Sequence, residues 1–336
     1  MFSNKILILT NGFENGIYMN RFTSIALAVA LIFVPFFASV SVPASAAVPA
    51  STLNLVIGEN VWINQSVVKT ENIVISTNGH LTINDATFTL GQSSNRQFHF
   101  DISGTLTLNN STITSDFLYD VSLRDSGKMV LKGSKIQQAG TLSASDGTGH
   151  IHLEKSMIDT QTPVQLAVTS FTYQDSNMKL APGISSDKVL ISKCYDSSLS
   201  VKSCDNLEIK DSDIGTLNVD ASYNTMTFIR SSVIAMTLHT TKKVVISDSS
   251  IESISITNNC DDLQISHSTL NFGLSLANVK NFKASQSTLN FDLQAEKRIT
   301  LEDVTLKNLV INGGGVFKNL TCDSLTVESQ SLTVAK

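Results

Sequence analysis

Charged residues are scarce in this chain, and the positive ones do not gather into a basic patch. Only 16% of the 336 residues are Asp, Glu, Lys or Arg, and the formal net charge is -5. Nucleic-acid binding needs clustered positive charge, so this composition excludes nucleic acid as a partner. Hydrophobic residues make up 42% of the chain, which is enough for a large core and argues against disorder.

Long hydrophobic runs are also missing, with one exception near the N-terminus. Residues 25–42 are almost wholly apolar, Arg21 precedes them and Ala44-Ser45-Ala46 follows them. A positive start, an apolar core and a small-x-small site are typical of a signal peptide. We therefore predict a signal peptide within residues 1–46 and cleavage before Ala47.

The first part of this segment does not fit that pattern. Residues 1–18 contain an acidic residue and no apolar core, whereas Met19 stands directly before the positive start. We therefore expect Met19 to be the true initiator and residues 1–18 to be a non-native extension. If the signal is not cleaved, residues 22–42 approach the length needed to cross a bilayer and would anchor the protein. Both alternatives predict a secreted or cell-envelope protein.

The rest of the chain contains a repeat. Its unit is apolar-x-apolar-x-x-small-x-apolar, as in Leu81-Thr82-Ile83-Asn84-Asp85-Ala86-Thr87-Phe88. Units start at residues 81, 106, 129, 151, 171, 189, 207, 226, 244, 263, 282, 299, 315 and 332, and the step shortens from 25 residues to between 16 and 19. Steps of this size suit one coil of a solenoid.

Alternation of period two predicts three short strands in each coil. In the unit that starts at Leu207, inward positions continue through Leu217 and Val219, while the residues between them point outward. We therefore predict an all-β fold, a single parallel β-helix over residues 47–336. The longer steps predict wider coils to about residue 165 and slimmer coils after it.

Stacked coils turn equivalent positions into columns, and one column is almost entirely serine. Small side chains fit an inside corner, and a buried hydroxyl without a partner costs about 1 to 3 kcal/mol, so each serine is expected to bond to backbone or to its neighbour in the next coil. We predict a structural role, not a nucleophilic one, for Ser111, Ser134, Ser156, Ser176, Ser212, Ser231, Ser249, Ser268 and Ser287.

Two further columns indicate how the chain turns. The position before each serine is often Asn, Asp or Gly, which tolerate a left-handed backbone. Between Lys155 and Asp248 the charges in this column alternate in sign, which predicts an exposed ion-pair ladder worth about 0 to 1 kcal/mol per pair. Glycines stand two residues before the early units and predict a sharper turn there, at Gly79, Gly104, Gly127 and Gly149.

The chain has only four cysteines, and their columns argue against disulfides. Cys204 and Cys260 share a column three coils apart, which is about 14 Å and too far for a bridge. Cys194 stands in the serine column and Cys322 replaces an inward aliphatic residue. We predict four free and largely buried thiols.

The repeat resembles the pectin-lyase-like parallel β-helix superfamily, especially non-enzymatic repeats of microbial surface proteins with phrases such as Gly79-His80-Leu81-Thr82-Ile83-Asn84-Asp85. The resemblance covers roughly residues 70 to 334. It implies a right-handed solenoid. It also raises enzymatic activity as an alternative, because many members of this superfamily cut acidic polysaccharides.

That alternative identifies a few candidate residues. Superfamily lyases hold calcium with a carboxylate cluster, and here Asp187 and Asp205 stack in neighbouring coils, but the columns add no further carboxylate. Superfamily hydrolases use several carboxylates with a His and an Arg element, which Asp261, Asp262, His267 and Arg298 imitate with the wrong spacing. We interpret these residues as surface charge and predict no catalytic site, metal site or cofactor.

The sequence thus favours a non-catalytic surface that serves structure, adhesion or glycan contact. Its expected partners are a polysaccharide or another surface protein. A polysaccharide lyase or glycoside hydrolase is the alternative from another class. A third hypothesis is end-to-end self-assembly through open solenoid ends, since Leu332-Thr333-Val334 begins another coil without a cap and exposed edge strands recruit partners.

Overall fold

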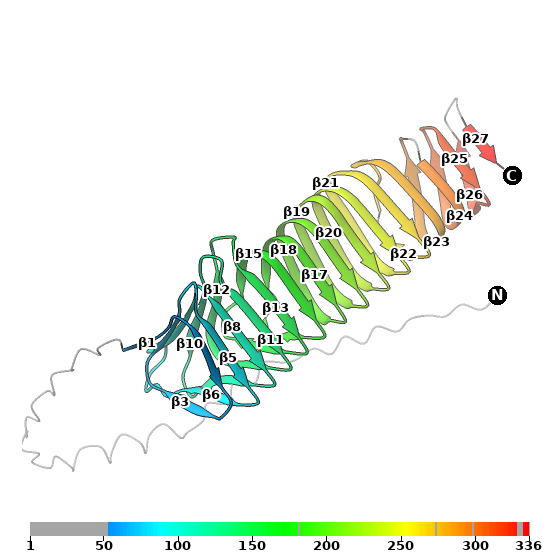
Figure 1. Ribbon diagram of the computed structural model, residues 1–336. Helices are drawn as coiled ribbons and strands as arrows, with labels where there is room; N and C mark the ends of the chain where they lie inside the picture. Colours follow the sequence, from blue (N-terminus) through cyan, green and yellow to red (C-terminus); the bar gives the residue numbers. More distant parts are fainter. Residues whose placement is uncertain (1–52, 181, 273, 298, 328–331, 336) are drawn as a thin grey trace, which may run out of the picture. The chain divides into compact units, whose positions relative to one another are not determined.

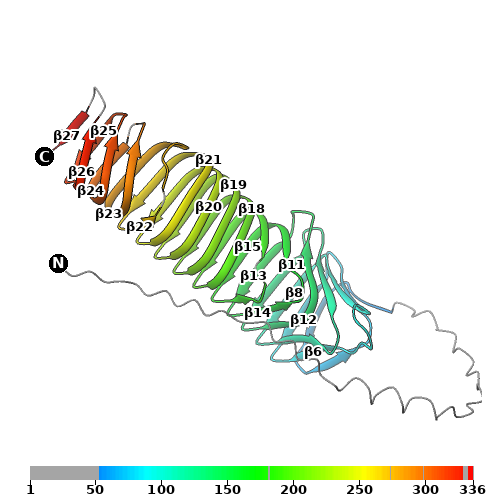
Figure 2. The ribbon, with the colours of Figure 1, turned by 180° about the vertical axis from the view of Figure 1, so that it is seen from behind.

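The computed structural model describes residues 53–180, 182–272, 274–297, 299–327 and 332–335. These residues form an all-β structure without a helix, a parallel β-solenoid of about 14 turns. Figures 1 and 2 show the coils stacked in one direction from β1 to β27. The predicted signal peptide lies outside the described residues, and no helix within them is long and apolar enough to cross a membrane.

The first coils contain three separate strands each, which stack into three columns. The first column consists of β1 (Asn54–Ile57), β4 (Asn72–Ile75), β7 (His99–Ile102) and β10 (Tyr119–Leu123). The second column consists of β2 (Asn60–Ile63), β5 (His80–Asn84), β8 (Thr105–Asn109), β11 (Lys128–Lys132) and β13 (His150–Glu154). The third column consists of β3 (Val67–Lys69), β6 (Thr87–Leu90), β9 (Thr112–Ser115), β14 (Met157–Thr160) and β16 (Asn177–Met178).

Later strands are longer, because the chain stays in strand conformation through corners at which the strands of the first coils end. The first long strands join two columns each: β12 (Lys135–Ala144), β15 (Gln165–Gln174) and β17 (Gly183–Ser192). Most of the following coils are single strands: β18 (Tyr195–Lys210), β19 (Asp213–Ile229), β20 (Ser232–Ser247), β21 (Ser250–Ser266), β23 (Val279–Ala295) and β24 (Ile299–Ile311). Shorter strands complete the stack: β22 (Thr269–Phe272), β25 (Gly315–Lys318), β26 (Thr321–Val327) and β27 (Leu332–Ala335).

The strand pairing follows the register that the repeat predicts. Leu81 pairs with Leu106 near the start of the stack, and Gly315 pairs with Leu332 near its end. Equivalent residues in adjacent coils are 25 positions apart at Asn84 and Asn109, but 16 apart at Asp303 and Asn319. The number of residues between these equivalent positions is therefore smaller near the end of the stack than near its start.

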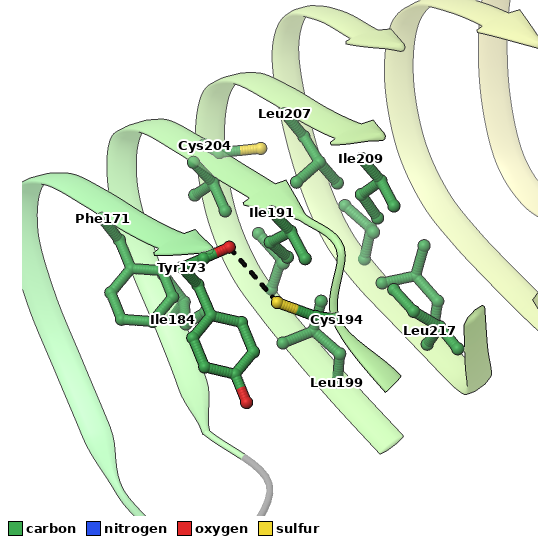
Figure 3. Close-up of a cluster of buried hydrophobic side chains, with 14 of the residues drawn as sticks. Phe171, Tyr173, Ile184, Ile191, Cys194, Leu199, Cys204, Leu207, Ile209 and Leu217 are labelled. Atoms are coloured by element: carbon green, nitrogen blue, oxygen red, sulfur yellow. Dashed lines mark hydrogen bonds between the residues drawn. The ribbon is translucent and has the colours of Figure 1, made fainter. Parts of the chain in front are cut away.

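The inward side chains form one continuous hydrophobic core along the stack. Large aromatic rings fill the longer coils, where Phe88 packs edge-on against Phe100 at a centroid distance of 5.4 Å. Figure 3 shows the core where the coils shorten, around Phe171, Tyr173 and the aliphatic residues of the next coils. Long coils need bulky residues because a void in a core removes packing contacts.

The serine column makes the backbone hydrogen bonds expected of buried hydroxyls. The Oγ of Ser231 donates to the carbonyl of Ile229 at 2.9 Å and accepts the N–H of Ser212 at 3.3 Å. The N–H of Ser231 in turn donates to the Oγ of Ser249 at 3.1 Å. The same two contacts recur at most other coils, so these hydroxyls link each coil to the next inside the corner.

The corner before this column is left-handed in every coil that contains it. Its residues have φ angles between 46° and 58°, from Asp85 to Asn319. Lys155, with φ 48°, and Arg230, with φ 47°, adopt this conformation without the short polar side chain that usually favours it. The backbone N–H of each donates to a carbonyl of the next coil, at 3.0 Å and 3.1 Å. These hydrogen bonds between stacked coils therefore stabilise the left-handed backbone even at residues that do not favour it.

The predicted ion-pair ladder at this corner is wrong in most of its steps. Among the described residues of the stretch with alternating charge, only Arg230 and Asp211 form an ion pair. Nε of Arg230 lies 2.7 Å from Oδ1 of Asp211, and Nη2 lies 3.0 Å from Oδ2. Asp248 instead accepts a hydrogen bond from the hydroxyl of Ser247 at 2.7 Å. The planar guanidinium fits a carboxylate with two bonds, whereas a flexible lysine gains little from a single exposed contact.

The early glycines are required by close approach between coils. A Cβ at Gly79 would overlap the carbonyl of Ile57, and a Cβ at Gly104 would overlap the carbonyls of Gly79 and Ser76. The sharper turn predicted there thus brings successive backbones into direct contact.

All four cysteines are free, and Cys194, Cys204 and Cys260 are buried. Cys204 and Cys260 belong to one column and are separated by Ser222 and Thr241, as the repeat predicts. The S–H of Cys194 donates to the carbonyl of Tyr173 at 3.3 Å (Figure 3).

Candidate functional site

The two carboxylates suggested as a calcium pair do share one surface hollow. Asp187 and Asp205 lie in adjacent coils and line a hollow of about 210 Å³ together with Tyr223. Calcium takes six to eight oxygen ligands, and two carboxylates supply at most four. Within the part of the chain that the structure describes, no three His, Cys, Asp or Glu side chains are grouped so that they could hold a metal ion.

The second candidate set is not assembled. Oδ1 of Asp261 lies 2.6 Å from Nζ of Lys280, and this contact lowers the pKa of Asp261. Asp262 pairs in register with Lys243 and accepts a hydrogen bond from Gln264 at 2.8 Å. These carboxylates therefore belong to local charge and hydrogen-bond pairs on the surface.

The histidine of that set lies at a different corner. His267 occupies the left-handed column, with φ 50°, and is exposed. Five residues of extended chain separate it from Asp262, which corresponds to about 16 Å. Arg298 lies outside the described residues. The structure therefore does not bring Asp262 and His267 together.

A cluster that the sequence analysis missed lies on the first column of strands. Phe100 and Val121 point into the core, so His99 and Asp101 of β7 and Asp120 of β10 point outward. Asp120 is the direct partner of His99 in the adjacent coil. These three side chains thus lie on one sheet face at neighbouring positions.

Two arginines complete this cluster. Nη2 of Arg124 lies 3.1 Å from Oδ1 of Asp101, and Nε of Arg96 lies 3.4 Å from Oδ1 of Asp120. Nε2 of His99 lies 3.4 Å from Oδ2 of Asp101. We call these five residues, Arg96, His99, Asp101, Asp120 and Arg124, the sheet-face cluster.

The loop before β7 brings one of these arginines into place. Gln92 is buried and donates from Nε2 to the carbonyls of Phe117 and Leu118, at 2.8 Å and 3.0 Å. Its Oε1 accepts the N–H of Phe98 at 3.1 Å. The loop that contains Arg96 is therefore fixed against the next coil.

The surroundings keep the carboxylates oriented and partly accessible. The hydroxyl of Thr141 donates to Oδ1 of Asp120 at 2.8 Å. A Cβ at Gly140 would lie 2.9 Å from that same oxygen, so glycine leaves room for it. Oδ1 of Asp101 is buried and makes no hydrogen bond within the described residues despite the nearby guanidinium. The side chains of Asp101 and Asp120 are nevertheless 21% and 31% exposed, so both remain partly accessible to a ligand.

The alternation of apolar and polar residues could have identified this cluster. His99-Phe100-Asp101-Ile102 and Tyr119-Asp120-Val121-Ser122-Leu123 both alternate. The repeat unit lies in the second strand column, whereas the loops before β7 and β10 differ in length. The repeat unit therefore does not determine the register of the first column in these coils.

The pKa values of several buried or half-buried groups are shifted. Burial raises the pKa of Asp196 to about 6, although the hydroxyl of Tyr173 donates to its Oδ1 at 3.1 Å and opposes the shift. Burial also raises the pKa of Cys194, Cys204 and Cys260 to about 11. At neutral pH these thiols are protonated and therefore poor nucleophiles.

No protein-family model, curated protein or solved structure matches this chain. The resemblance to the pectin-lyase-like superfamily therefore depends on the repeat residues alone, and the functional assignment depends on the geometry of the surface.

Proposed function

We propose that this protein is an exported or cell-envelope solenoid, right-handed and non-catalytic, that contacts polysaccharide through an outward sheet face. The observation that supports the proposal is the sheet-face cluster. Arg96 and Arg124 supply donors, Asp101 and Asp120 supply acceptors, and His99 stands between them. Sugar hydroxyls both donate and accept, so they match such a mixed set.

The rigidity of the solenoid strengthens this proposal. Parallel pairing on both sides holds β7 and β10 in place, and Gln92 fixes the loop that carries Arg96. A preorganised surface loses less conformational entropy when it binds. His99 and Arg124 have side chains 42% and 61% exposed, so the bonding groups of the cluster remain accessible to a long polymer.

A glycoside hydrolase is the second candidate, and one observation favours it. Asp101 and Asp120 lie on adjacent strands and are offset by two residues, which places their Cα atoms about 8 Å apart. Glycosidases use a pair of carboxyl groups on either side of the bond that they cut, and two outward carboxylates on one sheet face supply such a pair. Binding and cleavage must therefore be measured in the same assay.

The test is affinity electrophoresis of the purified protein in gels that contain neutral or acidic polysaccharides, combined with a reducing-end assay on the same mixtures. The cluster variant is Arg124→Gln combined with His99→Ala. The control is Lys202→Gln, an exposed charge on another part of the stack.

We expect at least one polysaccharide to retard wild type and the control, but not the cluster variant. No new reducing ends should form in any of these mixtures. New reducing ends that disappear in Asp120→Asn would establish the hydrolase instead. A protein that neither binds nor cleaves, or a cluster variant that binds like wild type, would refute the proposal.

A further inference from the structure

A second hollow lies along the left-handed corner, away from the sheet-face cluster. It has a volume of about 280 Å³ and is formed where β12, β14, β16 and β18 begin. We call it the corner hollow; its exposed lining residues are Lys135, Lys155, Asp175, Asn177, Lys193 and Tyr195.

The corner backbone determines where two of its lysines stand. Lys155 and Lys193 have φ angles of 48° and 55°, and Asp175 occupies the same column in the coil between them. Coils stack about 4.8 Å apart, so the two lysines leave the same corner about 10 Å from each other. Two cations about 10 Å apart, with Asp175 between them, suit a polymer whose negative groups recur at a similar interval.

The hollow has an excess of positive charge. In the described coils none of Lys135, Lys155 and Lys193 has a carboxylate within 4.0 Å of its ammonium group. In contrast, Arg230, two coils beyond Lys193, forms an ion pair with Asp211 at 2.7 Å. Among the described residues that line the hollow, Asp175 is the only acidic one. Three ammonium groups therefore face solvent and are available for an anionic ligand.

An aromatic side chain stands beside these charges. Tyr195 is 71% exposed, although it begins a strand whose other large residues are mostly in the core. An exposed tyrosine presents an apolar ring with a polar tip, which suits the C–H face and hydroxyls of a sugar ring. Tyr195 and the three lysines line the same hollow.

We infer that the corner hollow binds an anionic sugar chain, with Lys135, Lys155 and Lys193 contacting its carboxylate or sulfate groups and Tyr195 contacting a ring face. This inference deepens the proposed function and rests on it, because both assign polysaccharide binding. The two sites are separate, however, so variants can test them independently.

The test is binding of the purified protein to fluorescently labelled hyaluronate, dextran sulfate and neutral dextran between 20 and 300 mM NaCl. Hyaluronate supplies carboxylates and dextran sulfate supplies sulfates, so the two probes identify the preferred anion. The variant is Lys155→Gln combined with Lys193→Gln. Glutamine is compatible with this corner, because Gln286 occupies the same column with φ 48°. The matched control removes two exposed lysines elsewhere, Lys188→Gln with Lys202→Gln.

Wild type and control are expected to bind at least one anionic probe, more weakly as salt rises because exposed charges are screened. The double variant should lose at least tenfold in affinity, and Tyr195→Ala at least threefold. Equal affinity of the double variant and the control, or no binding of wild type to either anionic probe, would overturn the inference. Gel retardation that depends on the sheet-face cluster would still support the proposed function in that case.

Discussion

Asp196 allows a quantitative test of the core, because it places a carboxyl group where other coils have an aliphatic residue. Its partners in the next coils are Ile214 and then Val233. Burial raises its pKa from 3.8 to about 6, and its hydrogen-bond partner is the hydroxyl of Tyr173 at 3.1 Å. The folded protein therefore holds a proton that the unfolded chain has already released between about pH 4 and pH 6.

The sign of the effect follows from this difference in bound protons. Where the folded state binds more protons than the unfolded state, stability falls as pH rises. The contribution of Asp196 is thus fully present below pH 3.8 and is lost as the pH passes about 6. A shift of about two units corresponds to at most about 3 kcal/mol, and partial exposure of the carboxyl reduces this to about 1 to 2 kcal/mol.

Asp196→Asn removes the titration and keeps an acceptor for the Tyr173 hydroxyl. We expect the variant to equal wild type near pH 4 and to exceed it by about 1 to 2 kcal/mol near pH 7.5. Urea unfolding at both pH values measures this. The control is Asp211→Asn, because the hydrogen bond from Arg230 lowers the pKa of Asp211. That variant should lose stability relative to wild type at pH 7.5 and less at pH 3. An Asp196→Asn effect that is the same at both pH values would refute the reasoning.

Three further predictions concern the stack itself. Ser231→Ala leaves the buried N–H of Ser212 without its acceptor and should cost about 1 to 3 kcal/mol in urea unfolding, whereas Ser232→Ala should change stability by less than about 0.5 kcal/mol. Gly104→Ala places a Cβ against two backbone carbonyls and should cost about 1 to 3 kcal/mol or more, whereas Gly58→Ala meets only a side-chain oxygen at 3.7 Å and should be tolerated in thermal melts. A thiol reagent should label all four cysteines in denaturant and at most one in the native protein, since three are buried; fewer than four in denaturant would contradict the assignment of free thiols.

The features that the sequence predicted well are those that depend on the register of the coils. Equivalent residues stack at a constant spacing, so a column of small or left-handed positions follows from alignment alone. The left-handed corner includes Lys155 and Arg230, whose long side chains do not favour a positive φ angle. Alignment located them correctly because the coil above and the coil below determine the backbone, and the side chain contributes little.

The features that the sequence missed depend on side-chain reach and on loops. Alternating charge predicted a ladder, but among the described residues of that column only Arg230 forms an ion pair with its neighbour, because a lysine must lose rotamer freedom for a weak exposed contact. The sheet-face cluster depends on a loop held by Gln92, which brings Arg96 to Asp120 across a coil boundary. No repeat period encodes the path of such a loop.

The most direct test of the proposed function is the combined measurement of polysaccharide retardation and of new reducing ends on wild type and the Arg124→Gln, His99→Ala variant. Retardation of wild type that is lost in the variant, without new reducing ends, is the result we predict. Retardation that is the same in both proteins, or release of reducing ends by wild type, would contradict it.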